Sequence, residues 1–409
     1  MILRARLVVP MSQPPIEDGA IVIENDQIIA IGPTTDIRAQ HAGAMRDLGE
    51  VAVSPGLINA HCHLDYSDML DEVEWRGSFI EWILQLVALK RLRSEKQYRA
   101  AIQSGIAQLV RSGTTTVVNI ECFPGLIESV LPSPLRIWWC LELIDFNPTE
   151  PSNLEDLMQQ ALEGISKQQD LPGGWGLAPH APYTVSAALY RHAAQVSREM
   201  KILFTTHLAE SEQEDDMFRR GTGPMYDYFS RAGRSMGDCK RMGTVQLLSE
   251  YGVLGPNCLA AHANCLAPPD IARLKETGTH VVHCPKSHRF FNRDTPLLGL
   301  LWRDGVNVCL GTDSLASNDT LDMFAEMRTL ARMFPGLSAE RLLSMATVCG
   351  AKALNLGDKL GQLAVGAWAD LIAVPLGGEG MDSYEAVVFA EKPVCFSMMG
   401  GKVVFDENA

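Results

Sequence analysis

Short apolar runs alternate with longer helical patterns through the middle of the chain, and this alternation limits the possible folds more than any other feature. Eight of the runs are predicted as β-strands: Gly56–Ala60, Thr115–Ile120, Arg136–Ile144, Gly174–Ala178, Ile202–Thr206, Cys258–Ala261, His280–His283 and Val306–Gly311. Continuous apolar strands separated by helices are typical of a parallel sheet that helices cover. Eight such units over about 300 residues predict an α/β fold, a (β/α)8 TIM-like barrel. A doubly wound sheet would usually carry a glycine-rich phosphate loop after its first strand, and none follows Ala60.

Helical patterns separate most of the predicted strands. They cover Lys96–Arg111, Leu154–Ile165, Ser186–Met200, Asp270–Glu276 and Ala339–Leu354. The first of them is followed by Gly113, a residue type that commonly terminates helices. Two longer segments, Asp68–Arg93 and Ser211–Val253, are predicted as helical insertions at the mouth of the barrel.

Both ends of the chain are rich in short β patterns and poor in helical ones. The β-rich runs are Ile2–Val9, Ala20–Ile31, Asp370–Val374, Ala386–Ala390 and Val394–Phe405. Asn25-Asp26 and Gly400-Gly401 interrupt two of these runs, as expected of hairpin turns. Because neither end has enough apolar surface to fold alone, we expect residues 1–54 and 360–409 to form one small composite β-sandwich. The barrel domain is then expected at residues 55–359.

The composition argues against polyanionic partners. The chain has 409 residues, with 35 Lys and Arg against 49 Asp and Glu, which gives a formal net charge of −14. Nucleic acids and anionic membranes need clustered cations, so neither partner is expected. No apolar stretch approaches the length of a membrane span, the start MILRARLVVP lacks the pattern of a signal peptide, and the ten cysteines form no CxxC pair. These features predict a cytoplasmic protein with reduced thiols.

Polar side chains gather where the predicted strands end, which is the active-site side of a barrel. Six of the ten histidines fall at five of these strand ends: His61, His63, His180, His207, His262 and His283. His61 and His63 point the same way, because side-chain direction alternates along an extended segment. With His207 and Asp313 they form a plausible His3Asp shell for Zn²⁺ or Fe²⁺, with one position open to water.

Three further polar residues each allow two interpretations. Glu210 lies three residues after His207 and can reach the same pocket, or it can cap the helix that follows. His262 can act at the site or be a buried histidine that the backbone satisfies. His180, held between two prolines in APHAPY, suits either a substrate contact or a structural turn.

Seven segments, taken in order, resemble the amidohydrolase superfamily in its branch of metal-dependent deaminases: PGLINAHCHLD, APHAPYTVS, THLAE, AAHAN, HCPKSH, GVNVCLGTDSLASNDTLDMFAEM and GQLAVGAWADLI. The resemblance implies that one divalent ion, zinc before iron, is bound by four residues: His61, His63, His207 and Asp313. It further implies that Glu210 and His262 transfer protons and that His180 contacts the substrate. The strand GWGLAPHAPY has no lysine, so the resemblance implies a single metal ion. It also implies a homodimer or larger homo-oligomer.

The implied reaction replaces an amino group on an amidine-like ring carbon with oxygen from water and releases ammonia. A metal ion lowers the pKa of its bound water to about 7, so hydroxide forms at neutral pH. Asp313 can accept the proton of that water, Glu210 can protonate the neighbouring ring nitrogen, and His262 can stabilise the developing oxyanion. A barrel that only binds a ligand would be expected to lack one of the four metal ligands or one of the two proton-transfer residues. All six are present.

The resemblance favours an aminopurine nucleoside substrate and, among these, 6-aminodeoxyfutalosine. GSFIEWI and HCPKSHRFF resemble aminodeoxyfutalosine deaminases. Lys90-Arg91 stands where methylthioadenosine/S-adenosylhomocysteine deaminases carry an acidic residue, two turns after the tryptophan that matches Trp82. We expect Trp82 and Ser287 to contact the substrate, although Trp82 also fits a helix core. The substrate's benzoate could meet a cation, and the candidates are Arg91, Arg289 and Arg293. Methylthioadenosine, S-adenosylhomocysteine and adenosine are alternative substrates, and an s-triazine chlorohydrolase or aminohydrolase is the alternative activity.

Overall fold

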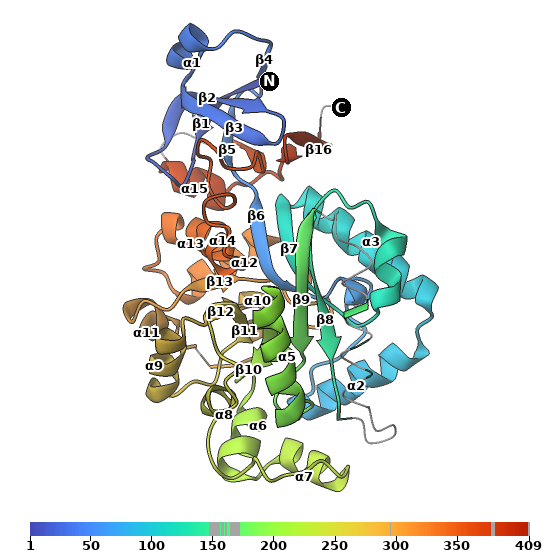
Figure 1. The fold of residues 1–409 in the computed structure, drawn as a ribbon. Helices are drawn as coiled ribbons and strands as arrows, with labels where there is room; N and C mark the ends of the chain where they lie inside the picture. The colour runs from blue at the N-terminus through green and yellow to red at the C-terminus, as the bar shows by residue number, and fades with distance from the viewer. Residues whose placement is uncertain are drawn as a thin grey trace.

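Eight parallel strands form the barrel that the sequence predicts (Figure 1). The computed structural model describes residues 1–146, 156, 159, 162–163, 172–294, 296–377 and 381–407. The barrel strands pair in chain order: β6 (Leu57–Cys62), β7 (Thr114–Glu121), β8 (Arg136–Leu143), β9 (Gly173–Pro179), β10 (Leu203–Leu208), β11 (Cys258–His262), β12 (His280–His283) and β13 (Val308–Leu310). Each overlaps its predicted range, so all eight strand predictions are confirmed.

The barrel closes between its first and last strands, β6 and β13. The carbonyl oxygen of His61 accepts hydrogen bonds from the backbone N–H groups of Thr312 and Asp313, at N···O distances of 3.1 and 3.0 Å. Gly311 permits this approach, because a Cβ atom at that position would lie 2.8 Å from the Cβ of His61. Closure therefore brings the two ends of the barrel sequence together at the carboxyl ends of the strands.

Apolar side chains cover both faces of the barrel strands. One buried cluster takes side chains from every barrel strand and fills the interior, with Ile58, Val118 and Val282 among its members. Alternate strand residues such as Val117 belong to a second buried cluster, which includes Leu109 of a surrounding helix. Burial on both faces explains why the strands read as continuous apolar runs in the sequence.

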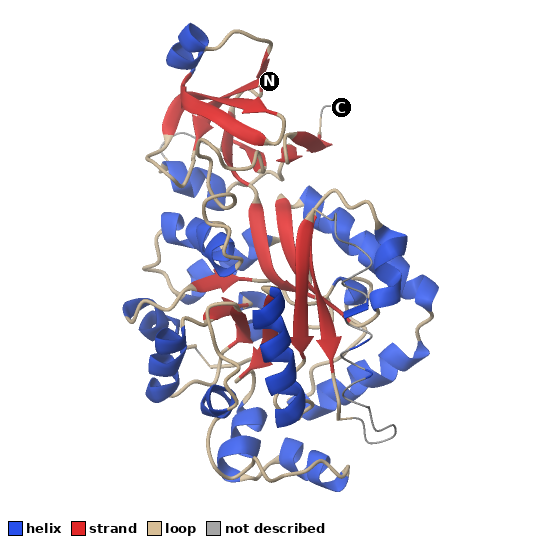
Figure 2. Cartoon of the chain, in the orientation of Figure 1, coloured by secondary structure: helices blue, strands red, loops and turns tan. Residues whose placement is uncertain are grey.

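Helices surround the barrel (Figure 2). They are α2 (Phe79–Leu92), α3 (Glu95–Arg111), α5 (Ala187–Met200), α6 (Glu212–Asp215), α7 (Pro224–Arg231), α8 (Thr244–Glu250), α9 (Pro268–Thr277), α10 (Pro285–Phe290), α11 (Leu298–Arg303), α12 (Met323–Met333), α13 (Ala339–Met345) and α14 (Val348–Ala353), with the short turns η1 (Leu64–Tyr66), η2 (Pro124–Val130) and η3 (Asp216–Arg220). The expected insertions contain α2 and the run from α6 to α8. Within the described ranges, no helix combines the length and apolarity needed to cross a bilayer.

The segment Ala339–Leu354 is mostly helical, as predicted, but it forms the two helices α13 and α14 rather than one. The break falls at Thr347, whose φ of −137° and ψ of −87° are not helical. The Thr347 hydroxyl donates to the carbonyl oxygen of Leu343 at 2.6 Å, a local bond that competes with the helical ladder. The predicted helix Leu154–Ile165 lies largely outside the described residues.

A second sheet is built from both ends of the chain, as the sequence predicts. Its order is β16-β15-β14-β5-β1-β2-β3, with β4 on β1. The strands are β1 (Ile2–Val8), β2 (Ile16–Glu24), β3 (Gln27–Pro33), β4 (Met45–Asp47), β5 (Val51–Pro55), β14 (Leu371–Pro375), β15 (Phe396–Met399) and β16 (Lys402–Asp406), and α1 (Thr34–Gln40) follows β3. The antiparallel pair β5–β14 joins the two ends. Figure 1 shows this sheet at one end of the molecule, with the arrowheads of β8 and β9 directed away from it.

The strand predicted at Ala386–Ala390 is wrong, because helix α15 (Ser383–Val388) occupies most of this segment. The carboxylate of Asp382 accepts a hydrogen bond from the Tyr384 N–H at 2.9 Å. Glu385 accepts one from the Asp382 N–H at 3.3 Å and completes a capping box. This start signal outweighs the β propensity of the valines that follow.

A buried ion pair links the barrel to the terminal sheet and generates a stability prediction. Arg136 at the start of β8 donates to both carboxylate oxygens of Asp370, at 2.6 and 3.2 Å, and both residues are buried. We expect Arg136→Ala to lower the free energy of unfolding by about 3 kcal/mol, because it leaves a buried carboxylate without its partner. The matched control is Arg99→Ala, which removes an exposed pair with Glu95 worth less than about 1 kcal/mol. Equal losses in the two variants, measured by chemical denaturation, would contradict this view.

Candidate metal centre and substrate cavity

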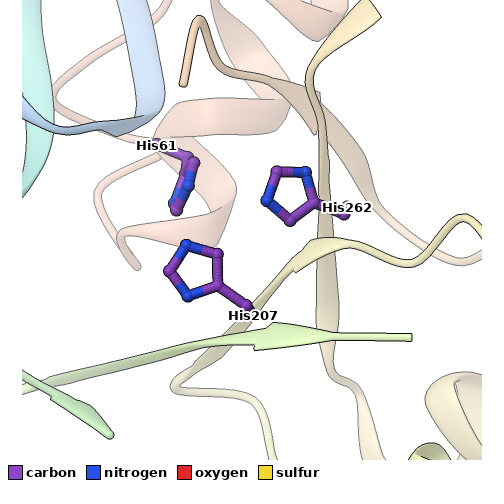
Figure 3. Close-up of side chains that lie close together, drawn as sticks. All are labelled: His61, His207 and His262. Carbon is purple, nitrogen blue, oxygen red and sulfur yellow. The ribbon is translucent and has the colours of Figure 1, made fainter. Parts of the chain in front are cut away.

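Five side chains from four strand ends converge at the mouth of the barrel. They are His61 near the end of β6, His63 directly after β6, His207 on β10, His262 on β11 and Asp313 after β13. His63 Nε2 lies 3.3 Å from His207 Nε2, and Asp313 Oδ1 lies 3.7 Å from His61 Nε2 and 3.8 Å from His63 Nε2. Figure 3 shows the rings of His61, His207 and His262 facing one common point. The structure thus brings the four predicted ligands together and adds His262 beside them.

The chemistry of this cluster fits a divalent metal ion. All five side chains are buried. Within the described part of the chain, both ring nitrogens of His61, Nδ1 of His63 and Nε2 of His262 have no hydrogen-bond partner. Burying so many unpaired polar atoms is costly unless something else binds them. Burial, reinforced by the neighbouring imidazoles, lowers the pKa of both His63 and His207, so these rings are neutral and able to act as ligands.

Hydrogen bonds behind the cluster orient two of its members. His207 Nδ1 lies 2.8 Å from the carbonyl oxygen of His180, which can only accept, so Nδ1 carries the proton and Nε2 faces the cluster. Asp313 Oδ2 accepts hydrogen bonds from the hydroxyls of Ser287 and Ser317, at 2.7 and 2.8 Å. Supports of this kind fix the direction of metal-binding side chains.

Ser287 does not occupy the place that the sequence prediction gave it. The residue is fully buried, is absent from the cavity wall and bonds to Asp313 rather than facing a substrate. Sequence reasoning placed Ser287 near the site through the HCPKSH segment but had no signal for the direction of its hydroxyl.

The backbone bends sharply where three strands deliver these residues. Ala209, His262 and Asp313 have φ angles of 50°, 72° and 60°, a left-handed region that non-glycine residues rarely adopt. Each such residue costs about 1 kcal/mol or more, and such residues cluster at functional sites. Without these bends the side chains would alternate between the two faces of each strand. The bends direct them towards the centre of the mouth instead.

Glu210 stands next to the cluster without being one of its close members. Its Oε1 lies 3.7 Å from His262 Nε2 and 3.4 Å from Arg293 Nη2. Burial raises the pKa of Glu210 to about 7, although the positive charge of Arg293 opposes the rise. The carboxyl group therefore exchanges its proton near neutral pH, as a proton donor requires.

The helix-cap interpretation of Glu210 does not hold. Ser211 caps α6 instead, because its hydroxyl accepts from the Glu214 N–H at 3.1 Å. Glu214, which sequence reasoning missed, accepts from the backbone N–H groups of Ala209 and Glu210, at 2.9 and 2.8 Å. Glu214 holds the bend, so the side chain of Glu210 is not needed as a cap and lines the cavity.

A cavity of about 360 Å³ opens beside the cluster. Its lining includes three groups: the centre itself, with His63, His207, Glu210, His262 and Asp313; a polar wall, with Tyr66, Lys90, Arg91, Glu142 and His180; and an apolar wall, with Phe79, Trp82, Ile83, Phe146, Tyr183 and Phe229. The expected contacts His180 and Trp82 thus both line the cavity. Of the three cations considered for a substrate carboxylate, only Arg91 lies on its wall.

Glu142 was missed in the sequence, although a charged residue near the carboxyl end of the apolar run RIWWCLELI was an available signal. Lys90 was noted only as a departure from the acidic residue of related deaminases. Its contact with Glu142 was not predicted, because lysines in an amphipathic helix are ordinarily exposed.

Comparisons with known proteins agree with this geometry. The profile of the "Amidohydrolase family" matches residues 52–404, and that of an "Imidazolonepropionase-like composite domain, bacteria" matches residues 19–44. A 5-methylthioadenosine/S-adenosylhomocysteine deaminase of Syntrophobacter fumaroxidans is 33% identical over 374 residues, covering 88% of this chain and 80% of the relative. An aminodeoxyfutalosine deaminase of Deinococcus radiodurans is 30% identical over 347 residues, covering 81% of this chain and 80% of the relative. The crystal structure of an adenosine deaminase from Xanthomonas campestris with bound zinc superposes with a TM-score of 0.86 at 26% identity, covering 99% of this chain and 92% of that one.

The metal centre predicts a specific loss. We expect His61→Ala to lower bound divalent metal at least roughly tenfold, because it removes a buried ring that belongs to both overlapping candidate groups. The matched control is His283→Ala, since His283 is equally buried and lacks hydrogen-bond partners within the described residues but belongs to no candidate metal group there. Metal content measured by mass spectrometry on folded protein decides, and equal metal in both variants would refute the site.

Proposed function

The chain belongs to the amidohydrolase family, and we propose that it removes the ring amino group of an adenosine-like nucleoside by hydrolysis. The main support for this proposal is the position of Glu210. Its carboxyl group, with a pKa of about 7, lines the same cavity as the buried cluster of histidines and Asp313. The names of the relatives support the substrate class, because methylthioadenosine, S-adenosylhomocysteine, aminodeoxyfutalosine and adenosine all fall within it.

We propose that four of the converging side chains hold one zinc ion: His61, His63, His207 and Asp313. Bound zinc in the Xanthomonas campestris structure supports the choice of metal. When bound, such an ion supplies a water whose pKa is low enough to give hydroxide at neutral pH. The two serine hydroxyls on Asp313 Oδ2 leave Oδ1 turned towards the histidines, where it can accept the proton that this water releases.

Glu210 and His262 act on the substrate in this proposal. Protonated Glu210 donates to the ring nitrogen next to the amino-bearing carbon, which makes that carbon more electrophilic. Nε2 of His262 has no partner within the described residues, so it can donate to the oxygen that bonds to the carbon. Proton transfer to the amino group then breaks the C–N bond. The balance is R–NH2 + H2O → R–OH, as its keto tautomer, + NH3.

The proton-transfer role predicts a large loss of rate without loss of metal. We expect Glu210→Gln to lower kcat/KM by about 10²- to 10⁴-fold, because glutamine keeps the shape but has no acidic proton. Ammonia release from methylthioadenosine or adenosine measures the rate, and metal content is the control. A variant within threefold of the wild-type rate would remove Glu210 from the mechanism.

Among the nucleosides, we favour 6-aminodeoxyfutalosine as the physiological substrate. The cavity places Arg91 on its wall, where a guanidinium can bind a carboxylate. We expect the highest kcat/KM for 6-aminodeoxyfutalosine when it is compared with methylthioadenosine, S-adenosylhomocysteine and adenosine. Chloride release from a chlorinated s-triazine, with no ammonia from any nucleoside, would establish the alternative hydrolase activity instead.

A further inference from the structure

A row of polar side chains lies on the half of the barrel mouth that the proposed chemistry does not use. In the parallel register, Ile120 of β7 pairs with Cys140 of β8, and Glu142 of β8 pairs with Ala178 of β9. Ile120, Cys140 and Ala178 belong to the interior cluster. Side-chain direction alternates along a strand, so the residue two positions further on points to the same side and lies above this cluster. The top row of these three neighbouring strands is therefore Cys122, Glu142 and His180.

Lys90 of α2 reaches into this row. Its ammonium group donates to the hydroxyl of Tyr66 and to Cys122 Sγ, the latter at 3.3 Å. It stands 3.9 Å from Glu142 Oε2, and the Cys122 thiol donates to the same oxygen at 2.8 Å. Burial raises the pKa of Glu142, but the charge of Lys90, the nearby His180 and the hydrogen bond from Cys122 together bring this pKa to about 2. Glu142 is thus an ionised carboxylate inside the cavity.

One hydrogen bond and one ion pair of Glu142 both fall on the same carboxylate oxygen, Oε2. Oε2 takes the thiol and faces the ammonium, whereas no donor to Oε1 occurs within the described residues. The side chain is only 7% exposed, yet it forms part of the cavity wall. An ionised oxygen on the wall of a cavity favours hydrogen-bond donors, and a bound ligand can supply them.

The neighbours of this carboxylate limit the kind of donor. Lys90 already balances its charge, so a cationic ligand group would meet an ammonium 3.9 Å behind the carboxylate. Neutral hydroxyl groups fit better. Next to it, His180 Nδ1 bonds to the Thr184 hydroxyl at 2.6 Å, which leaves Nε2 as a second polar contact on the same wall.

We propose that Glu142, positioned by Lys90 and Cys122, accepts hydrogen bonds from the ribose hydroxyls of the nucleoside and sets the preference for ribose. This inference rests on the proposed function, because a sugar reaches this wall only when the base lies at the metal centre. Glu142 contacts the substrate away from the reacting atoms, whereas Lys90 and Cys122 are positioning residues.

The test compares kcat/KM for adenosine and 2′,3′-dideoxyadenosine in wild type and in Glu142→Gln. We expect wild type to prefer adenosine by roughly 10- to 100-fold, as for hydrogen bonds to a charged acceptor. Glu142→Gln should reduce the preference to within about threefold while leaving the rate on the dideoxynucleoside nearly unchanged. The matched control is Glu121→Gln, a buried glutamate on β7 that accepts from Asn119 and Phe123 and does not line the cavity.

The outcomes separate the two proposals. A wild-type enzyme that deaminates neither nucleoside, nor methylthioadenosine or 6-aminodeoxyfutalosine, overturns the proposed function and this inference with it. A wild-type enzyme that deaminates both nucleosides equally, or a Glu142→Gln variant that keeps the preference, overturns the inference alone. An equal loss on both nucleosides shows a structural role instead. If Glu142→Gln does not fold, the double variant Lys90→Met/Glu142→Met removes both buried charges together and takes its place.

Discussion

The hydrogen bonds that close the barrel are the constraint on which the candidate centre depends. The carbonyl oxygen of His61 accepts from two consecutive N–H groups of the segment after β13. This fixes Asp313 next to His61, although the two lie 252 positions apart in the chain. The approach is possible because position 311 is a glycine, and a larger residue there would collide with His61 itself. Packing of the whole barrel therefore sets the separation of a carboxylate and an imidazole.

The mouth of the barrel divides into two halves with different chemistry. Strand ends from β6, β10, β11 and β13 supply the histidines and Asp313, while β7, β8 and β9 supply the row above the interior cluster. The apolar wall lines the cavity beside these two halves, with side chains from α2 and from the segments after β8 and β9. A ligand with an aromatic base at one end and hydroxyl groups at the other matches this division. The same fold thus separates the reacting atoms from the atoms that are only recognised.

The sequence predicted most of the fold and the centre because both depend on local patterns. Continuous apolar runs identified all eight barrel strands, and strand ends identified the five converging residues. The pairing of Glu142 with Lys90 was not predicted, because it comes from strand register and from how α2 packs over the mouth, which no single segment encodes. The helix predicted at 339–354 is interrupted where a threonine hydroxyl bonds to the backbone, and the strand predicted at 386–390 was wrong because a capping box starts a helix there. The homo-oligomer, the cytoplasmic location and the domain limits stay predictions.

Charge balance gives an argument for the cation that does not depend on ligand geometry. Three carboxylates line the cavity within the described residues: Glu142, Glu210 and Asp313. Glu142 has Lys90 at 3.9 Å, and Glu210 has Arg293 at 3.4 Å. Within the described residues, Asp313 has imidazoles and two hydroxyls near its oxygens but no lysine or arginine paired with it. A buried carboxylate that lacks a lysine or arginine partner is favoured when another cation joins it. The need for positive charge at Asp313 therefore supports a divalent ion at this centre.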